Sequence, residues 1–181
     1  LSANQALSSW NSGNVLHSDE ITEITTAGNQ LLFSSQDSGL ARYNWNSGFW
    51  LATWNDANWL ASNTVSGAQA YQDTLHIMSG DQLHRYDLST GVFGASIDLS
   101  QMNLTETSAN MMMPWSPGGA RAPSSMMHAM TDGSRLVLMD ATMQSTMQRE
   151  IVIASGPSGP EMSDAVEHDG ILYVAGYTSE Q

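Results

Sequence analysis

The chain has 181 residues and a formal net charge of −13, with five arginines and no lysine. This length suffices for one domain with a hydrophobic core. The acidic balance excludes a basic groove for nucleic acid or anionic lipid, and the lack of cysteine excludes disulfides, thiolate metal sites and cysteine nucleophiles. No apolar run approaches the roughly 20 residues of a membrane-spanning helix, so no membrane span is expected.

Short, partly alternating apolar runs separated by turn residues predict two groups of four β-strands. The first group covers residues 21–27, 31–35, 40–45 and 49–54. The second group covers residues 63–71, 74–79, 82–87 and 92–99. Because the connections are short, consecutive strands are expected to be antiparallel neighbours in a four-stranded meander. No helical periodicity of useful length competes with this interpretation.

The two groups repeat each other in sequence. The Arg-Tyr-Asn-Trp-Asn-Ser-Gly stretch at residues 42–48 returns 43 positions later as Arg-Tyr-Asp-Leu-Ser-Thr-Gly at residues 85–91. The Trp-Asn pair at residues 10–11 returns after 44 positions at residues 54–55. A period in the low forties is typical of propeller or solenoid units, none of which can bury its apolar face without a neighbour.

The repeated stretch also predicts a specific turn. The side chain of Asn44 or Asp87 can accept hydrogen bonds from backbone amides two or three residues further along. Gly48 or Gly91 can then adopt the positive φ that closes the hairpin. These residues are therefore expected to act in folding.

The rest of the chain is less regular. Strands are predicted at residues 126–130, 135–139 and 148–154. About 18 extra residues precede them within residues 102–123, which are expected to form a long loop. After a linker-like turn at residues 155–160, strands at residues 164–168 and 171–175 begin a fourth group.

Two stretches resemble known propeller repeats. Residues 86–91, Tyr-Asp-Leu-Ser-Thr-Gly, look like the Asp-x-x-Thr-Gly turn of quinoprotein-type and kelch-like blades, and residues 169–178 are similar to the repeat of bacterial and archaeal surface propellers. The resemblance implies an all-β fold, a β-propeller segment of about three to four four-stranded antiparallel blades, incomplete at both ends. Its units would cover about residues 10–53, 54–97, 98–157 with the inserted loop 102–123, and a partial 158–181. Remaining blades or a second copy would cover the exposed blade edges.

The propeller resemblance also predicts where a ligand would bind. The loops between blades would share one face with the central hairpin turns, namely residues 54–62, 102–123, 36–38 and 80–81. The candidate ligand-binding residues there are Trp59, Trp115, Asp37 and Asp81. Trp10 and Trp54 repeat each other and are expected to pack between blades. Trp59 and Trp115 have no aromatic counterpart in the repeat, so both burial and ligand contact stay open for them.

Soft ligand atoms also gather in one stretch. The candidate ligands for Cu(I) are Met126, Met127, His128 and Met130. Methionine, however, commonly fills irregular gaps in a hydrophobic core. We favour this packing role for these methionines, so no metal site is predicted. His76 and His84, on adjacent predicted strands, are expected to be solvated or hydrogen-bonded rather than bound to metal.

The chain contains no nucleophile elbow, phosphate loop, zinc-protease motif or acidic calcium loop. This favours a non-enzymatic scaffold for protein or carbohydrate interaction that needs no cofactor. The polar composition and the N-glycosylation sequon at residues 103–105 favour an extracellular or cell-surface location. The alternative is part of a cofactor-binding propeller enzyme, similar to a quinoprotein dehydrogenase, whose site would be completed by further blades.

Overall fold

The structure is a computed structural model. It describes residues 10, 11, 13 and 15–102, and beyond these the backbone of strands within 109–115, 127–132, 135–140, 149–152, 161–168 and 171–177. Side chains are described up to residue 100, together with Tyr173. Within this part of the chain, no helix is long and apolar enough to cross a membrane.

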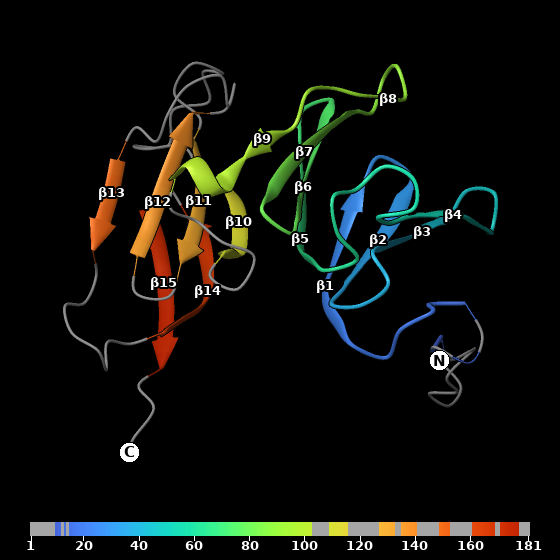
Figure 1. The fold of residues 1–181 in the computed structure, drawn as a ribbon, viewed down its shortest axis with the longest axis horizontal. Coiled ribbons are helices and arrows are strands. Elements are labelled where there is room, and N and C mark those ends of the chain that lie inside the picture. The colour runs from blue at the N-terminus through green and yellow to red at the C-terminus, as the bar shows by residue number, and fades with distance from the viewer. Residues whose placement is uncertain are drawn as a thin grey trace.

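The first sheet is a four-stranded antiparallel meander. Its strands are β1 (Ile21–Ala27), β2 (Gln30–Ser35), β3 (Leu40–Asn44) and β4 (Phe49–Trp54). They lie in the order β1-β2-β3-β4, each paired with the next along the chain (Figure 1). The predicted boundaries are confirmed to within one residue, because short turns with Gly or Asn interrupt each apolar run.

The second sheet repeats this meander with a broken last strand. It contains β5 (Val65–Tyr71), β6 (Thr74–Ser79), β7 (Gln82–Asp87), β8 (Val92–Phe93) and β9 (Ile97–Asp98). Both β8 and β9 pair with β7, so the single strand predicted at residues 92–99 is wrong. The break covers residues 94–96, where the Gly94 N–H donates to the Arg85 carbonyl and the Nε of Arg85 donates to the Ala95 carbonyl. A short helical turn, η1 (Leu99–Met102), follows β9.

The third sheet corrects the predicted loop at residues 102–123. It consists of β10 (Ala109–Trp115), β11 (Met127–Asp132), β12 (Arg135–Asp140) and β13 (Arg149–Val152), in that order. Ala109–Trp115 therefore form a strand paired with β11. The run of three methionines hid the alternation typical of a strand, and Pro114 is tolerated because β10 is an edge strand, where a missing N–H breaks no second ladder. A further hairpin, β14 (Glu161–His168) and β15 (Ile171–Tyr177), forms the last sheet.

The sheets are arranged around their first strands. β1 lies against β5, β5 against β10, and β10 against β14, so that each sheet extends outward from an inner strand (Figure 1). Side chains connect the first two inner strands: Thr22 Oγ1 donates to the carbonyl of Val65 at 2.9 Å, and the Ala68 N–H donates to Glu23 Oε2 at 2.8 Å. Consecutive antiparallel meanders with adjacent inner strands are the blades of a β-propeller.

Among the described side chains, the core lies mainly between the first two sheets. Its buried residues are Ala27, Leu32, Leu40, Trp54, Leu60, Val65, Ala68, Leu75 and Ile77. The strand registers make Leu31 equivalent to Leu75, since they pair with Tyr43 and Tyr86, and Leu32 equivalent to His76. Leu32, Leu75 and His76 are all almost completely buried, so the middle strands contribute to packing with both faces.

Candidate functional site

The turns that end β3 and β7 have the predicted hydrogen bonds. Asp87 Oδ1 accepts from the N–H groups of Ser89 at 2.8 Å and Thr90 at 2.9 Å, and Asn44 Oδ1 makes the equivalent pair of bonds at 3.0 Å each. Gly48 and Gly91 have φ values of 73° and 75°. The Ser89 side chain and these amides lower the pKa of Asp87, because they bond its ionised form.

Trp54 is confirmed as an inter-blade residue. It ends β4 and is only 4% exposed, because its ring packs against Tyr86 and Phe93 of the second sheet, with centroid distances of 4.6 and 4.9 Å. Trp10 packs in the same manner against Tyr43 and Trp50 of the first sheet, at 4.9 and 5.1 Å. Each tryptophan thus precedes the loop that leads into a sheet and packs on that sheet's outer strands.

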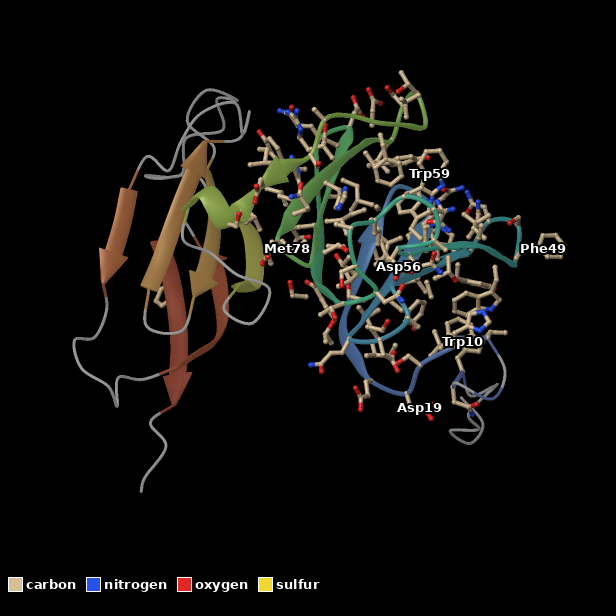
Figure 2. All side chains as sticks on the ribbon, viewed as in Figure 1. Trp10, Asp19, Phe49, Asp56, Trp59 and Met78 are labelled. Carbon is tan, nitrogen blue, oxygen red and sulfur yellow. The ribbon has the colours of Figure 1, made fainter. Side chains whose placement is uncertain are left out.

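The loop after Trp54 also repeats an earlier segment, with one substitution that changes its surface. The Asn55 carbonyl accepts from the N–H groups of Trp59 and Leu60, just as the Asn11 carbonyl accepts from those of Val15 and Leu16. Leu16 and Leu60 are both buried. Trp59 therefore stands where the preceding repeat has valine, and it is 58% exposed (Figure 2).

The loop at residues 55–64 meets the two hairpin turns, as the propeller arrangement predicts. The Asn63 carbonyl accepts from the Gly39 N–H at 2.8 Å, and the Thr64 carbonyl accepts from the Gly80 N–H at 3.1 Å. Asp37 and Asp81 are exposed in these turns. This face therefore brings together three of the four segments expected there. The fourth candidate segment contains Trp115, whose backbone lies opposite Met127 in the third sheet and whose side chain is outside the described part.

A pocket of about 290 Å³ lies between the first two sheets on their outer side. Its lining consists of Arg42, Trp54, Trp59, Tyr86, Gly91, Val92 and Phe93. The rings of Trp59 and Phe93 are stacked, with an interplanar angle of 10° and a centroid distance of 5.5 Å, so one ring lies over part of the other. Of the four residues predicted to bind ligand, Trp59 lines this pocket, whereas Asp37 and Asp81 do not. The sequence signal for Trp59 was its departure from the repeat.

Arg42 is the one charged residue of the lining, and sequence reasoning missed it. It is 9% exposed, and its guanidinium carbon lies 3.7 Å from the centroid of the Trp54 ring. Its Nε donates to the Ala52 carbonyl at 3.0 Å. Burial lowers the pKa of Arg42, and the neighbouring Tyr86 side chain opposes that effect. Arginine nevertheless keeps its positive charge at neutral pH, so the pocket contains a buried cation.

Two buried histidines support the second sheet. His84 Nε2 accepts from the Ala61 N–H at 3.2 Å and thereby holds the loop that carries Trp59, which confirms that His84 is hydrogen-bonded. His76 is 2% exposed, so it is not the solvated side chain that we considered possible for it. Burial, followed by the charge of Arg85, lowers the pKa of His76 to about 4.

Metal ligands are not grouped in the part of the chain that the structure describes, where no three His, Asp or Glu side chains surround a common point. The Cu(I) candidates fall elsewhere. Met126 lies outside the described residues, and Met127, His128 and Met130 belong to β11, of which the backbone alone is described.

No protein-family model and no curated protein matches the sequence. Solved structures do match the fold. BamB from Moraxella catarrhalis is 14% identical, with a TM-score of 0.57 over 90% of this chain and 43% of BamB. The designed protein Ika8 is 13% identical, with a TM-score of 0.58 over 86% of this chain and 42% of its own. The extracellular domain of BT3049 from B. thetaiotaomicron is 13% identical, with a TM-score of 0.62 over 95% of this chain and 22% of the BT3049 chain.

These similarities agree with the arrangement of the sheets, and the chain is an all-β protein with β-propeller blades. It spans less than half the length of each of these proteins. At such low identity the likeness concerns the fold alone, because one fold can support many unrelated functions.

Proposed function

We propose that the chain is a non-enzymatic β-propeller scaffold that binds carbohydrate through the pocket between its first two blades. The observation that carries this proposal is the exposed indole of Trp59, which is 58% exposed and is held in place by stacking on Phe93, parallel to within 10°. The C–H groups on one face of a sugar ring can pack on such a surface while its hydroxyl groups stay in water. A half-exposed tryptophan offers this combination of apolar contact and solvent access.

The rest of the lining suits binding. Besides Trp59 and Phe93 it supplies two more aromatic rings, one valine, one glycine and the Arg42 guanidinium. Aromatic rings and a guanidinium can orient a ligand, but a guanidinium stays protonated near neutral pH and so cannot act as a general base. The volume of about 290 Å³ is at the small end of ligand pockets, which fits one sugar unit better than an extended protein segment.

An extracellular or cell-surface location fits this activity. The sequence is polar, and two similar solved structures are the extracellular domains of BT3049 and BT4673. A polysaccharide ligand would be met outside the cell.

Binding of the full chain to a glycan array tests the proposal. Trp59→Ala should abolish binding with little change in thermal stability, since the side chain is more than half exposed. Trp45→Ala is the matched control, because Trp45 is also exposed but does not line the pocket. A wild-type chain that binds no glycan, or a Trp59→Ala variant that binds as well as wild type, would contradict the proposal.

A further inference from the structure

The charge of the pocket narrows the ligand class. Arg42 is more than nine-tenths buried and lines the pocket, yet within the described part of the chain no carboxylate forms an ion pair with it. Its contacts are a backbone carbonyl, the face of Trp54 and the side chain of Tyr86. Burying a charge is costly unless the charge is paired, so a buried and unpaired cation beside a cavity favours an anion inside that cavity.

The geometry of Arg42 leaves donors for such an anion. A guanidinium has five N–H donors. The Ala52 carbonyl takes the Nε–H, and the Tyr86 side chain interacts with another part of the group. The Trp54 ring covers one face of the guanidinium plane and so fixes its orientation. A planar, fixed guanidinium with free terminal N–H groups suits two parallel hydrogen bonds to a carboxylate.

The second repeat shows which part of this arrangement is structural. Arg85 occupies the same repeat position, and its Nε donates to the Ala95 carbonyl at 3.3 Å, as that of Arg42 does to Ala52. The bond from Nε to a carbonyl is therefore a feature of the blade. Arg85, however, does not line the pocket. Among the side chains that the structure describes, Arg42 and not Arg85 is placed beside this cavity.

We propose that the pocket binds an acidic sugar unit, a uronic acid, whose ring packs on Trp59 and whose carboxylate pairs with Arg42. This inference rests on the proposed carbohydrate function and adds the charge of the ligand. It commits to a sugar because the pocket combines an exposed indole with a volume suited to one ring. The net charge of −13 repels anions at a distance, so selectivity comes from the contact with Arg42 itself.

Matched ligand pairs test the proposal directly. Methyl glycosides of glucuronic, galacturonic and mannuronic acid are titrated into the full ¹⁵N-labelled chain beside those of glucose, galactose and mannose. Each pair differs only in a carboxylate or a hydroxymethyl group. The indole N–H signal of Trp59, assigned with a Trp59→Phe variant, reports binding at the pocket. At least one uronide should bind about tenfold more tightly than its neutral partner.

Three variants assign the effect. Arg42→Lys keeps the charge but loses the planar fork, so it should weaken binding of the uronide much more than binding of its neutral partner and thereby remove most of the preference. Trp59→Val introduces the residue found at this position in the preceding repeat, and it should lower the affinity for both ligands of a pair about equally. Arg85→Gln is the control and should bind like wild type. Circular dichroism and thermal melting show whether each variant is folded.

The outcomes separate the two proposals. If neutral and acidic sugars bind equally and both depend on Trp59, the acidic-sugar inference is overturned and the carbohydrate function stands. If acetate alone at the same concentration shifts the Trp59 signal as much as the uronide does, the site recognises a carboxylate without a sugar, which also overturns the inference. If no sugar moves the signal, both proposals fail. A preference for the uronide that persists in Arg42→Lys would overturn the role of the guanidinium fork.

Discussion

Stability should fall in mild acid because of one buried histidine. His76 lies in β6, 2% exposed, with its backbone paired to Gln69 on one side and Arg85 on the other. Burial first, and the charge of Arg85 second, lower the pKa of His76 from 6.5 to about 4. In the unfolded chain the same side chain is solvated and titrates near its ordinary value. Between these two pKa values the unfolded state therefore binds more protons than the folded state.

The sign and size of the effect follow from this difference. The stabilisation is fully present above pH 6.5 and is lost as the pH falls towards the folded-state pKa of about 4. At about 1.4 kcal/mol per pH unit, the free energy of unfolding should decrease by about 3 kcal/mol over this window. His84, whose pKa burial also lowers, acts in the same direction. The lowered pKa of the Asp87 carboxyl makes the free energy of unfolding depend on pH only below its ordinary value of 3.8, outside this window.

Urea unfolding followed by tryptophan fluorescence at several pH values between 4.5 and 7.5 measures the effect. His76→Gln should flatten the dependence on pH, because glutamine does not titrate. His17→Asn is the control, since His17 is exposed and asparagine tolerates its positive φ of 62°. A titration of the His76 ring by NMR gives the pKa directly. A measured pKa at or above 6.5, or an equally steep pH dependence in His76→Gln, would refute the reasoning.

Four further substitutions test the packing by thermal and urea unfolding. Gly39→Ala should cost more than about 2 kcal/mol, because φ is 90° and a Cβ would collide with the Trp54 carbonyl oxygen, whereas Gly28→Ala, with open space around it, should cost only about 1 kcal/mol. Trp54→Ala should cost about 3–5 kcal/mol by leaving a cavity between the blades; a loss below 1 kcal/mol would show that the blades do not depend on it. Glu23→Ala should cost about 1–3 kcal/mol by removing the acceptor for the Ala68 N–H between the inner strands, and an unchanged melting temperature would contradict that role.

The regular part of the fold was predictable because local and long-range signals agree there. Alternating apolar runs gave the strands of the first two sheets, and the Asp87 turn followed from side-chain chemistry at fixed spacing. The strand β10 was missed because three consecutive methionines and Pro114 obscure alternation, so only pairing with β11 makes the segment a strand. Periodicity carries no sign of the division of the fourth strand into β8 and β9, and the bond from Arg85 to Ala95 does not explain it, since Arg42 makes the same bond to Ala52 in the unbroken β4.

The candidate site was predictable only in part. Trp59 was identified because it breaks the repeat. Arg42 and Tyr86 were not, because both conform to the repeat and their equivalents serve the framework. What makes them part of a pocket is their position between two blades, which depends on how sheets pack. Conversely, Asp37 and Asp81 lie on the predicted face but away from the pocket, since a shared face does not imply a shared cavity.

The position of Trp54 has an evolutionary consequence. It ends the last strand of one sheet but is buried by the next, so the sequence repeat and the blade are out of phase. A duplication of the period that ends at Trp54 delivers a further tryptophan to the added blade, whereas the period after it ends at Asp98. A gene encoding such a chain can therefore gain a blade of the first kind in a single step without creating a new interface. Insertions of other lengths would instead leave one blade without its partner side chain.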